Sequence, residues 1–256
     1  MKRNIIHLKE IDSTNRFLKE RNEGQDYKRL TPEEVMASPE ENMTIAVADF
    51  QTAGKGQGTH VWESEAGKNL LFSIEVHPAW VPVSRQFLLS EIGALAIKEA
   101  LDSYADCFSL KWPNDVYWND KKISGTLIET SIDSHGIKRC IFGVGINVNQ
   151  LHFFSDAPNP VSLAQIVGHE VDREELLHKV LDVFEHYYGL LRQADYMDVS
   201  GIYHLALYRR KGFHWYEDAD GKFEGAFVEV EDDGYLILHD KKGVIRSYAF
   251  GEVKFL

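Results

Sequence analysis

The chain has 256 residues, of which 44% are hydrophobic, so it can bury the core of one large domain or of two. Its 28 Lys and Arg residues against 40 Asp and Glu residues give a formal net charge of −12. This acidic balance argues against non-specific nucleic-acid binding, which needs basic surfaces. No apolar run approaches the roughly 18 residues of a membrane span, and the N-terminus is too weakly apolar for a signal peptide.

The first third of the chain is predicted to hold strands and one helix. Asp12 and Ser13 offer N-cap side chains to a helix over Thr14–Arg21. The polar segment Gly24–Asn42 contains two prolines and is expected to be a loop. Apolar runs predict strands at Ile5–Leu8, Thr44–Phe50 and Asn69–Val76.

The middle of the chain alternates between strand and helix patterns. Asp172 is predicted to cap the clearest helix, Asp172–Ala194, with Glu175 completing a capping box. Shorter helical segments are expected at Leu163–Val167 and Ile202–Leu207. Strands are predicted at Phe108–Leu110, Val116–Trp118, Ile123–Ile132 and Ile137–Val148. Pro82 is expected to start an amphipathic helix whose buried face is formed by Phe87, Leu88, Ile92, Leu95, Ala96, Glu99 and Leu101.

The pattern changes after Gly212, where short β segments are separated by Asp-Gly and Lys-Gly turns. Regular short strands with such turns predict a small barrel. Before it, consecutive antiparallel strands with helices beside them indicate an α+β fold with a mixed, mainly antiparallel sheet. Cys107 and Cys140 both lie in apolar surroundings and are predicted to be reduced core residues, which favours a cytoplasmic location.

A glycine-rich loop, QTAGKGQGTHVW (Gln51–Trp62), lies between two predicted strands. Its glycines at 54, 56 and 58 permit positive φ and a close backbone approach, so exposed N–H groups could cradle an anion beside Lys55. It is neither a Walker A loop nor a GxGxxG motif. A simple surface hairpin loop is the alternative interpretation.

A second motif stretch, KWPNDVYWNDKKISGTLIE (Lys111–Glu129), is followed by GVGINVN (Gly143–Asn149), and IDSTN (Ile11–Asn15) precedes both. Together with the glycine-rich loop, in this order and spacing, these motifs resemble the catalytic domain of biotin–protein ligases. The loop departs from the family pattern, because Lys55 stands where arginine is common and Gly58-Thr59 reverses the expected order.

The resemblance implies a class II synthetase-like catalytic domain over residues 1–210 and an SH3-like C-terminal domain over residues 211–256. Relatives that also repress transcription carry a helix-turn-helix domain before the catalytic domain. Only eleven residues precede Asp12, so we expect no DNA-binding role. We also expect no membrane association, and either a monomer or a homodimer.

The resemblance further implies a two-step reaction. The carboxylate of biotin attacks the α-phosphorus of ATP to give biotinyl-5′-AMP and pyrophosphate. A lysine of a biotin carboxyl carrier protein then attacks the mixed anhydride and releases AMP. Mg²⁺ is expected on the phosphates, whereas the histidines show no zinc-type spacing and predict no protein-built metal site.

The resemblance also assigns residues to roles. The catalytic candidates are Lys111, between carboxylate and α-phosphate, and Lys55. The biotin-binding candidates are Ser13, Thr14, Asn15, Gln51, Gly54, Lys55, Gly56, Gln57, Lys111 and Gly125, with Gly143 as a further point of close approach. The ATP-binding candidates are Trp62, which would stack on adenine, Asn114, Lys122 and Asn147.

Structural roles compete with these assignments. Ser13 and its neighbours could simply cap the first helix, and Lys111 could be a solvated strand-end lysine. Asn114 and Asp115 could be turn residues, and Lys122 a structural charge in a hairpin. Two rival functions are a lipoate or octanoate–protein ligase, whose histidine-bearing motif this chain lacks, and a non-catalytic biotin-binding scaffold, which only the altered loop supports.

Overall fold

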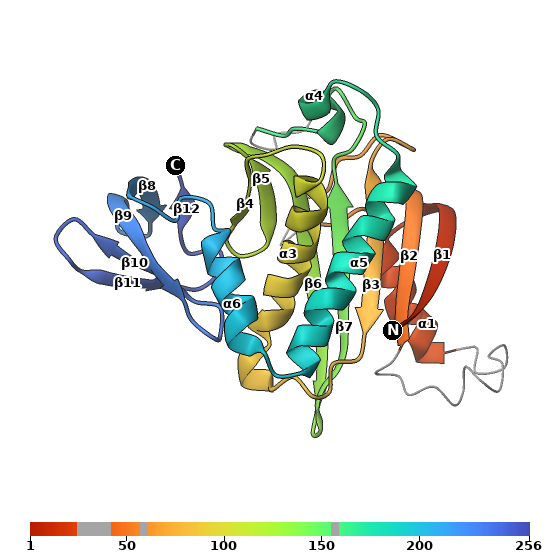
Figure 1. Cartoon of the computed structure of the whole chain (residues 1–256), viewed down its shortest axis with the longest axis horizontal. Coiled ribbons are helices and arrows are strands. Elements are labelled where there is room, and N and C mark those ends of the chain that lie inside the picture. Colours follow the sequence, from red (N-terminus) through yellow and green to blue (C-terminus); the bar gives the residue numbers. More distant parts are fainter. Residues whose placement is uncertain (25–41, 57–60, 155–158) are drawn as a thin grey trace.

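The computed structural model describes residues 1–24, 42–56, 61–154 and 159–256 (Figure 1). The loop predicted over Gly24–Asn42, and the residues Gln57 and Gly58-Thr59 of the glycine-rich loop, lie mostly or wholly outside the described residues.

A seven-stranded sheet forms the centre of the molecule, with strand order β1-β2-β3-β7-β6-β5-β4 (Figure 1). β1 and β2 pair in parallel, and the other neighbouring strands pair antiparallel. This mixed, mainly antiparallel sheet confirms the predicted α+β class. Its strands are β1 (Lys2–Ile11), β2 (Asn42–Gln51), β3 (Leu70–Val76), β4 (Phe108–Lys111), β5 (Asp115–Trp118), β6 (Lys121–Asp133) and β7 (Gly136–Ile146).

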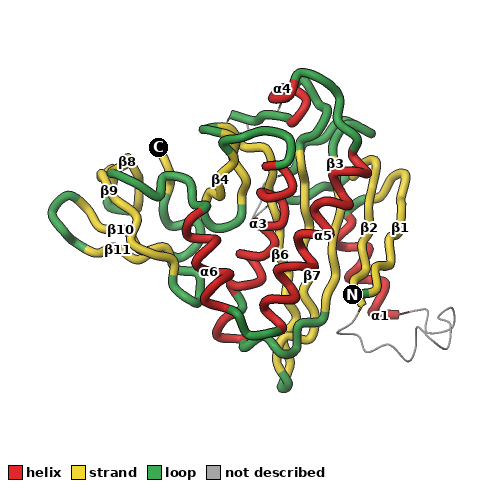
Figure 2. Tube along the Cα trace, viewed as in Figure 1, coloured by secondary structure: helices red, strands yellow, loops and turns green. Residues whose placement is uncertain are grey.

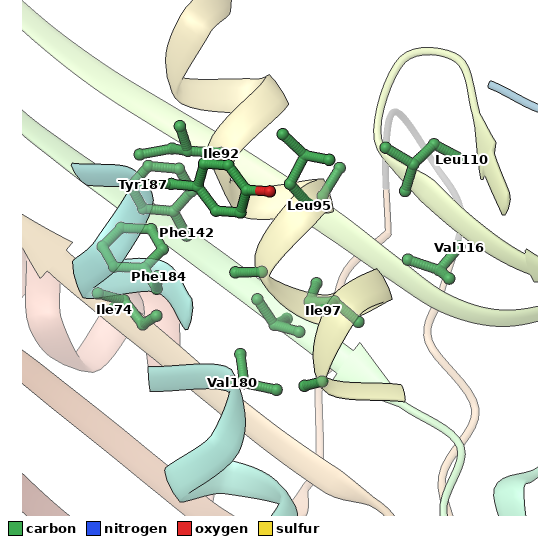
Figure 3. Close-up of a cluster of buried hydrophobic side chains, with 14 of the residues drawn as sticks. Ile74, Ile92, Leu95, Ile97, Leu110, Val116, Phe142, Val180, Phe184 and Tyr187 are labelled. Carbon is green, nitrogen blue, oxygen red and sulfur yellow. The ribbon is translucent and has the colours of Figure 1, made fainter. Parts of the chain in front are cut away.

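Three helices lie side by side on one face of this sheet, as Figure 2 shows for α3, α5 and α6. Between them and the strands lies the main hydrophobic core, in which Ile92 of α3, Phe142 of β7 and Phe184 of α5 meet (Figure 3). Among the described residues, no helix has the length and apolar character needed to cross a membrane. The helices are α1 (Thr14–Gly24), α3 (Phe87–Asp102), α4 (Leu163–Val167), α5 (Arg173–Arg192) and α6 (Tyr196–Leu205).

The opposite face of the sheet is covered by α1. Leu18 of this helix packs against Ala46 of β2 and Ile141 of β7. Their chain neighbours, Ile45 and Phe142, belong to the main core instead. Successive side chains of a strand point to opposite faces, so this alternation places α1 across the sheet from α3 and α5. The sheet therefore has helices on both faces, with α1 against β2, β3 and β7, and β3 is buried along its whole length.

The long helix α3 differs from its prediction in two ways. Pro82 has an extended backbone and precedes a 3-10 turn, η2 (Val83–Arg85), so the helix starts at Phe87 instead. It is also buried on nearly all sides rather than on one stripe, because it is packed between the sheet, α5 and α6.

The prediction that both cysteines are core residues was half wrong. Cys140 is buried, but Cys107 is exposed. Cys107 adopts a left-handed turn conformation, with φ 73°, and the next residue, Phe108, takes the buried position as β4 begins.

A five-stranded antiparallel sheet follows α6 and lies beside the β4 edge of the large sheet (Figure 1). Its strand order is β11-β10-β9-β8-β12, which agrees with a small barrel-like domain. Backbone hydrogen bonds attach β4 to the segment that leads from α6 to this sheet, since Leu110 of β4 donates to Ala206 and accepts from Tyr208. The strands are β8 (Phe213–Asp218), β9 (Gly221–Val230), β10 (Leu236–Asp240), β11 (Ile245–Tyr248) and β12 (Lys254–Phe255).

Candidate active site

One cavity of about 1270 Å³ collects most of the site residues predicted from the sequence. Its wall is formed by α1, by strands of the large sheet, and by residues 250–256 of the second sheet. Of the predicted residues, Gly54 is buried but does not line the cavity, and Gln57 lies outside the described residues. The predicted residues that do line it are Ser13, Thr14, Asn15, Gln51, Lys55, Gly56, Trp62, Lys111, Asn114, Lys122, Gly125, Gly143 and Asn147.

A polar network occupies the end of the cavity next to α1. The Oε1 atom of Gln51 accepts from the backbone N of Thr14 at 2.8 Å and from its hydroxyl at 3.1 Å. The hydroxyl of Ser73 lies 2.6 Å from both Thr14 Oγ1 and Asn15 Oδ1. Asn15 in turn donates to Glu129 at 3.0 Å. Thr14 and Asn15 are buried, so their side chains do more than cap a helix.

Two members of this network were not identified in the sequence. Ser73 received no role, although it is the one hydroxyl residue in the apolar strand β3. Glu129 ends the KKISGTLIE motif, but no role was assigned to it either. Only the pairing of β3 with β2 and β7 brings Ser73 under α1.

The floor of the cavity is built from glycines on β6 and β7. A β-carbon on Gly143 would lie 2.2 Å from Asn15 Oδ1, and one on Gly145 would lie 2.4 Å from the Trp62 ring. One on Gly125 would lie 3.1 Å from the same ring. Side chains of the chain itself therefore come close to the strands at Gly125 and Gly143, and the approach of biotin expected there stays a prediction. Gly145, whose role was not predicted, is equally constrained.

An ion pair lies beside Trp62. The Nζ atom of Lys122 is 2.6 Å from Asp115 Oδ2 and 6.0 Å from the centre of the Trp62 ring. Asn114 donates to the carbonyl of Thr126 at 3.2 Å. Lys122 thus has the structural partner expected in a hairpin, and it also faces the cavity.

Lys111, at the end of β4, is half-buried rather than freely solvated. Its ammonium donates to the hydroxyl of Tyr117 at 3.0 Å and lies 4.9 Å from the centre of that ring. The centre of the Phe255 ring, in the second sheet, lies 5.1 Å from the same ammonium. Burial lowers the pKa of Lys111, and the nearby Asp115 carboxylate only partly offsets this effect.

Lys55 and Asn147 lie at other parts of the wall. Lys55 is exposed and forms an isolated bridge with Val61, and Trp62 donates its backbone N–H to Gly54 at 3.0 Å. These contacts close the base of the glycine-rich loop. Asn147 is buried, and its side chain donates to the carbonyl of Val161 at 3.2 Å.

No group of three or more His, Cys, Asp or Glu side chains converges in a metal-binding arrangement within the described part of the chain. The polar groups of the cavity include an amide and hydroxyl network next to α1, the lysines at 55, 111 and 122, and carboxylates such as Asp115 and Glu129. Such a cavity is suited to a ligand with a polar ring at one end and a charged group at the other.

The chain is similar to known proteins along its whole length. The model of the "Biotin/lipoate A/B protein ligase family" matches residues 9–147, and that of the "Biotin protein ligase C terminal domain" matches residues 217–256. A biotin protein ligase from Aquifex aeolicus, solved in complex with biotin and ATP, is 30% identical, with a TM-score of 0.77 and 99% of each chain covered.

Two curated relatives show a similar level of identity. A bifunctional ligase/repressor BirA of Bacillus spizizenii is 28% identical over 212 residues, which are 80% of this chain and 64% of the relative. A biotin–[acetyl-CoA-carboxylase] ligase of Paracoccus denitrificans is 28% identical over 211 residues, which are 77% of this chain and 84% of the relative. This chain thus spans less than two thirds of the first relative and most of the second. With more than half of its residues matched by the family model, the chain belongs to the biotin/lipoate A/B protein ligase family.

Proposed function

We propose that the chain is an ATP-dependent biotin–protein ligase, which forms biotinyl-5′-AMP and transfers biotin to a lysine of a biotin carboxyl carrier domain. The observation that carries this proposal is that one cavity contains both Lys111 and the hydrogen-bonded pair of Thr14 and Gln51, in a chain with a ligase fold. We assign residues 1–210 to the catalytic domain and residues 211–256 to the SH3-like domain. The acceptor would be the carrier domain of a biotin-dependent carboxylase in the cytoplasm.

The first step must bring two anions together. A carboxylate and a phosphate about 4 Å apart repel by about 4 kcal/mol at an effective dielectric near 20. Lys111 and Lys55 would offset this repulsion and stabilise the charge that develops on the α-phosphate. Lys111 is the better placed, because its ammonium is half-buried and held by neighbouring groups.

The two ends of the cavity would recognise different parts of the reactants. Thr14, Asn15 and Gln51 present hydroxyl and amide groups that can pair with the polar ring of biotin. Trp62 would provide a flat face for adenine at the other end, with Asn147 close by. The indole N–H of Trp62 is buried and has no hydrogen-bond partner among the described residues.

The donor set of the site fits a loosely held Mg²⁺. Mg²⁺ in nucleotide sites is bound mainly by phosphate oxygens and water, with one or two protein carboxylates. Asn114 and Asp115 line the cavity and would supply the protein oxygens. When bound, the ion would neutralise part of the phosphate charge.

Pyrophosphate release from ATP, measured with biotin and separately with lipoate, tests the proposal. Release with biotin, followed by transfer of labelled biotin to a carrier domain, is the expected result. Release with lipoate alone would favour a lipoate ligase, and binding of biotin without release would indicate a non-catalytic scaffold. The variant Lys111→Ala should lose release at least a hundredfold, whereas Lys98→Ala, on α3 away from the cavity, should not.

A further inference from the structure

The second sheet contributes directly to the surroundings of Lys111. The Lys111 ammonium lies 4.9 Å from the ring centre of Tyr117, in the large sheet, and 5.1 Å from the ring centre of Phe255, in β12. Tyr117 also accepts a hydrogen bond from this ammonium, whereas Phe255 offers only its ring face. No role was assigned to Phe255 from the sequence.

The ring of Phe255 is held firmly in place. Phe255 pairs with Tyr216 across β12 and β8, and the two rings pack edge to face with their centres 5.0 Å apart. The next residue, Leu256, donates its N–H to Trp215 at 3.1 Å and accepts from Arg209 at 2.5 Å. The second sheet thus fixes the ring that faces the ammonium.

The residue that follows Lys111 in the chain also contacts the second sheet. Trp112, which is buried, donates its indole N–H to the carbonyl of Gly234 at 3.0 Å, and its ring lies 5.6 Å from Phe250. The carbonyl of Pro113 accepts from Tyr203 of α6 at 2.6 Å. The two residues that follow Lys111 are therefore held by the second sheet and by α6.

A lysine side chain has four rotatable carbon–carbon bonds, and its ammonium is attracted to the face of an aromatic ring. Contacts with Tyr117 and Phe255 limit where the ammonium can lie, and because neither residue is charged, the ammonium keeps its positive charge for the reactants. Reaction rates depend steeply on such placement, because a displaced group no longer faces the reacting atoms. We propose that Phe255 is a positioning residue, whose ring holds the Lys111 ammonium where the carboxylate and the α-phosphate meet. The effect on catalysis rests on the proposed ligase function, whereas the contact between Phe255 and Lys111 does not.

The test compares Phe255→Met, which keeps a similar volume but removes the ring face, with Phe255→Tyr, which keeps it. The matched control is Phe213→Met. Phe213 lies in the same sheet and has its own lysine, Lys241, 5.9 Å from its ring, but it does not line the cavity. Phe255→Leu is a second ring-less variant, and unfolding in urea checks that each variant is folded.

Two readouts are needed for each full-length variant. The first is the rate at which acetic anhydride labels the Lys111 amine at pH 8, followed by peptide mass spectrometry. This rate should rise about threefold in Phe255→Met, because the charged form loses a favourable ring. The second is biotinyl-AMP formation, where kcat should fall about tenfold while KM for ATP and biotin stays within about twofold. Phe255→Tyr should restore both values, and Phe213→Met should change neither.

Equal labelling of Lys111 in the wild type, Phe255→Met and Phe255→Leu would overturn the positioning role, whatever the activity. An equal fall of kcat in Phe255→Tyr would also overturn it, because that variant retains the ring. If labelling changes as expected but the wild type forms no biotinyl-AMP, the ring contact is supported and the ligase function fails.

Discussion

The Oδ1 atom of Asn15, on α1, lies only 2.2 Å from the position that a β-carbon of Gly143, on β7, would occupy. Real β-carbons essentially never approach an oxygen so closely, so the helix side chain can reach its place only because residue 143 lacks a side chain. The same side chain is bonded to Ser73 and Glu129. The glycine on one element and the asparagine on the other therefore form one unit of the cavity wall.

Gly143→Ala is expected to push Asn15 out of the network and to destabilise the protein by about 1–3 kcal/mol. KM for biotin should rise at least tenfold. The matched control is Gly189→Ala in α5, where a β-carbon meets nothing within 4 Å. Because alanine favours a helix interior over glycine, the control should gain about 0.5–1 kcal/mol. Urea unfolding and biotin titration measure both effects, and a Gly143→Ala protein as stable as its control would contradict the geometry.

Ser73→Ala removes the hydroxyl that joins Thr14 and Asn15 beneath α1. A buried partner left unpaired costs about 1–3 kcal/mol, so biotin affinity should fall about tenfold or more. KM for ATP should remain unchanged, because the partners of Ser73, Thr14 and Asn15, lie at the end of the cavity assigned to biotin. Isothermal titration with biotin measures the loss. Ser103→Ala, at the end of α3, provides the control, and equal biotin affinities in the two variants would refute the role given to Ser73.

Lys122→Met leaves the carboxylate of Asp115 without its partner beside the cavity. An uncompensated negative charge there should repel the phosphates, so KM for ATP should rise about tenfold. The double variant Lys122→Met with Asp115→Asn should regain part of this loss, since both charges are gone. Steady-state kinetics on the four proteins of this cycle measure the coupling. A double variant worse than Lys122→Met would rule out the ion pair as the source of the effect.

Glu91→Gln should stabilise the protein at alkaline pH. Glu91 is buried between α3 and α6 and accepts from Ser200 at 2.8 Å. Burial raises its pKa from the ordinary 4.5 to about 8. The folded protein keeps this proton up to about pH 8, whereas the unfolded chain releases it near pH 4.5. The free energy of unfolding therefore falls as the pH rises between these values.

The glutamine removes this dependence, because it stays neutral at every pH. The gain over the wild type should be on the order of 4 kcal/mol above pH 8 and close to zero at pH 4. Urea unfolding at both pH values measures it. A constant difference between the two proteins across the whole range would show that Glu91 does not carry this proton.

Elements with strong local signals were predicted well from the sequence. The helix α4 has the predicted bounds, because Ser162 and Gln165 form a reciprocal capping box and Gly168 ends the helix with φ 82°. Asp172 caps α5 as expected and accepts from the N–H groups of Glu174 and Glu175. The predicted capping box was wrong, because the carboxylate of Glu175 pairs with Lys179 at 2.8 Å instead of with the backbone of Asp172.

Features that depend on distant contacts were not predictable. Phe255 lies 144 residues after Lys111 in the chain, and only the packing of two sheets joins them. Ser73 is the one hydroxyl residue in a mostly apolar strand, and its partners come from α1. The burial of α3 on nearly all sides also depends on two later helices. Motifs thus identified many side chains of the cavity, whereas supports such as Ser73 and Phe255 lie outside every motif.

The hydrogen bond from Trp112 to Gly234 bears on how this protein could be re-engineered. It joins the lysine-bearing segment to a turn that a designer might regard as belonging to an exchangeable module. A chimera that imports the last five strands from a homologue would break this junction unless the donor supplies a matching carbonyl and an aromatic at position 255. The two sheets would therefore have to be exchanged together.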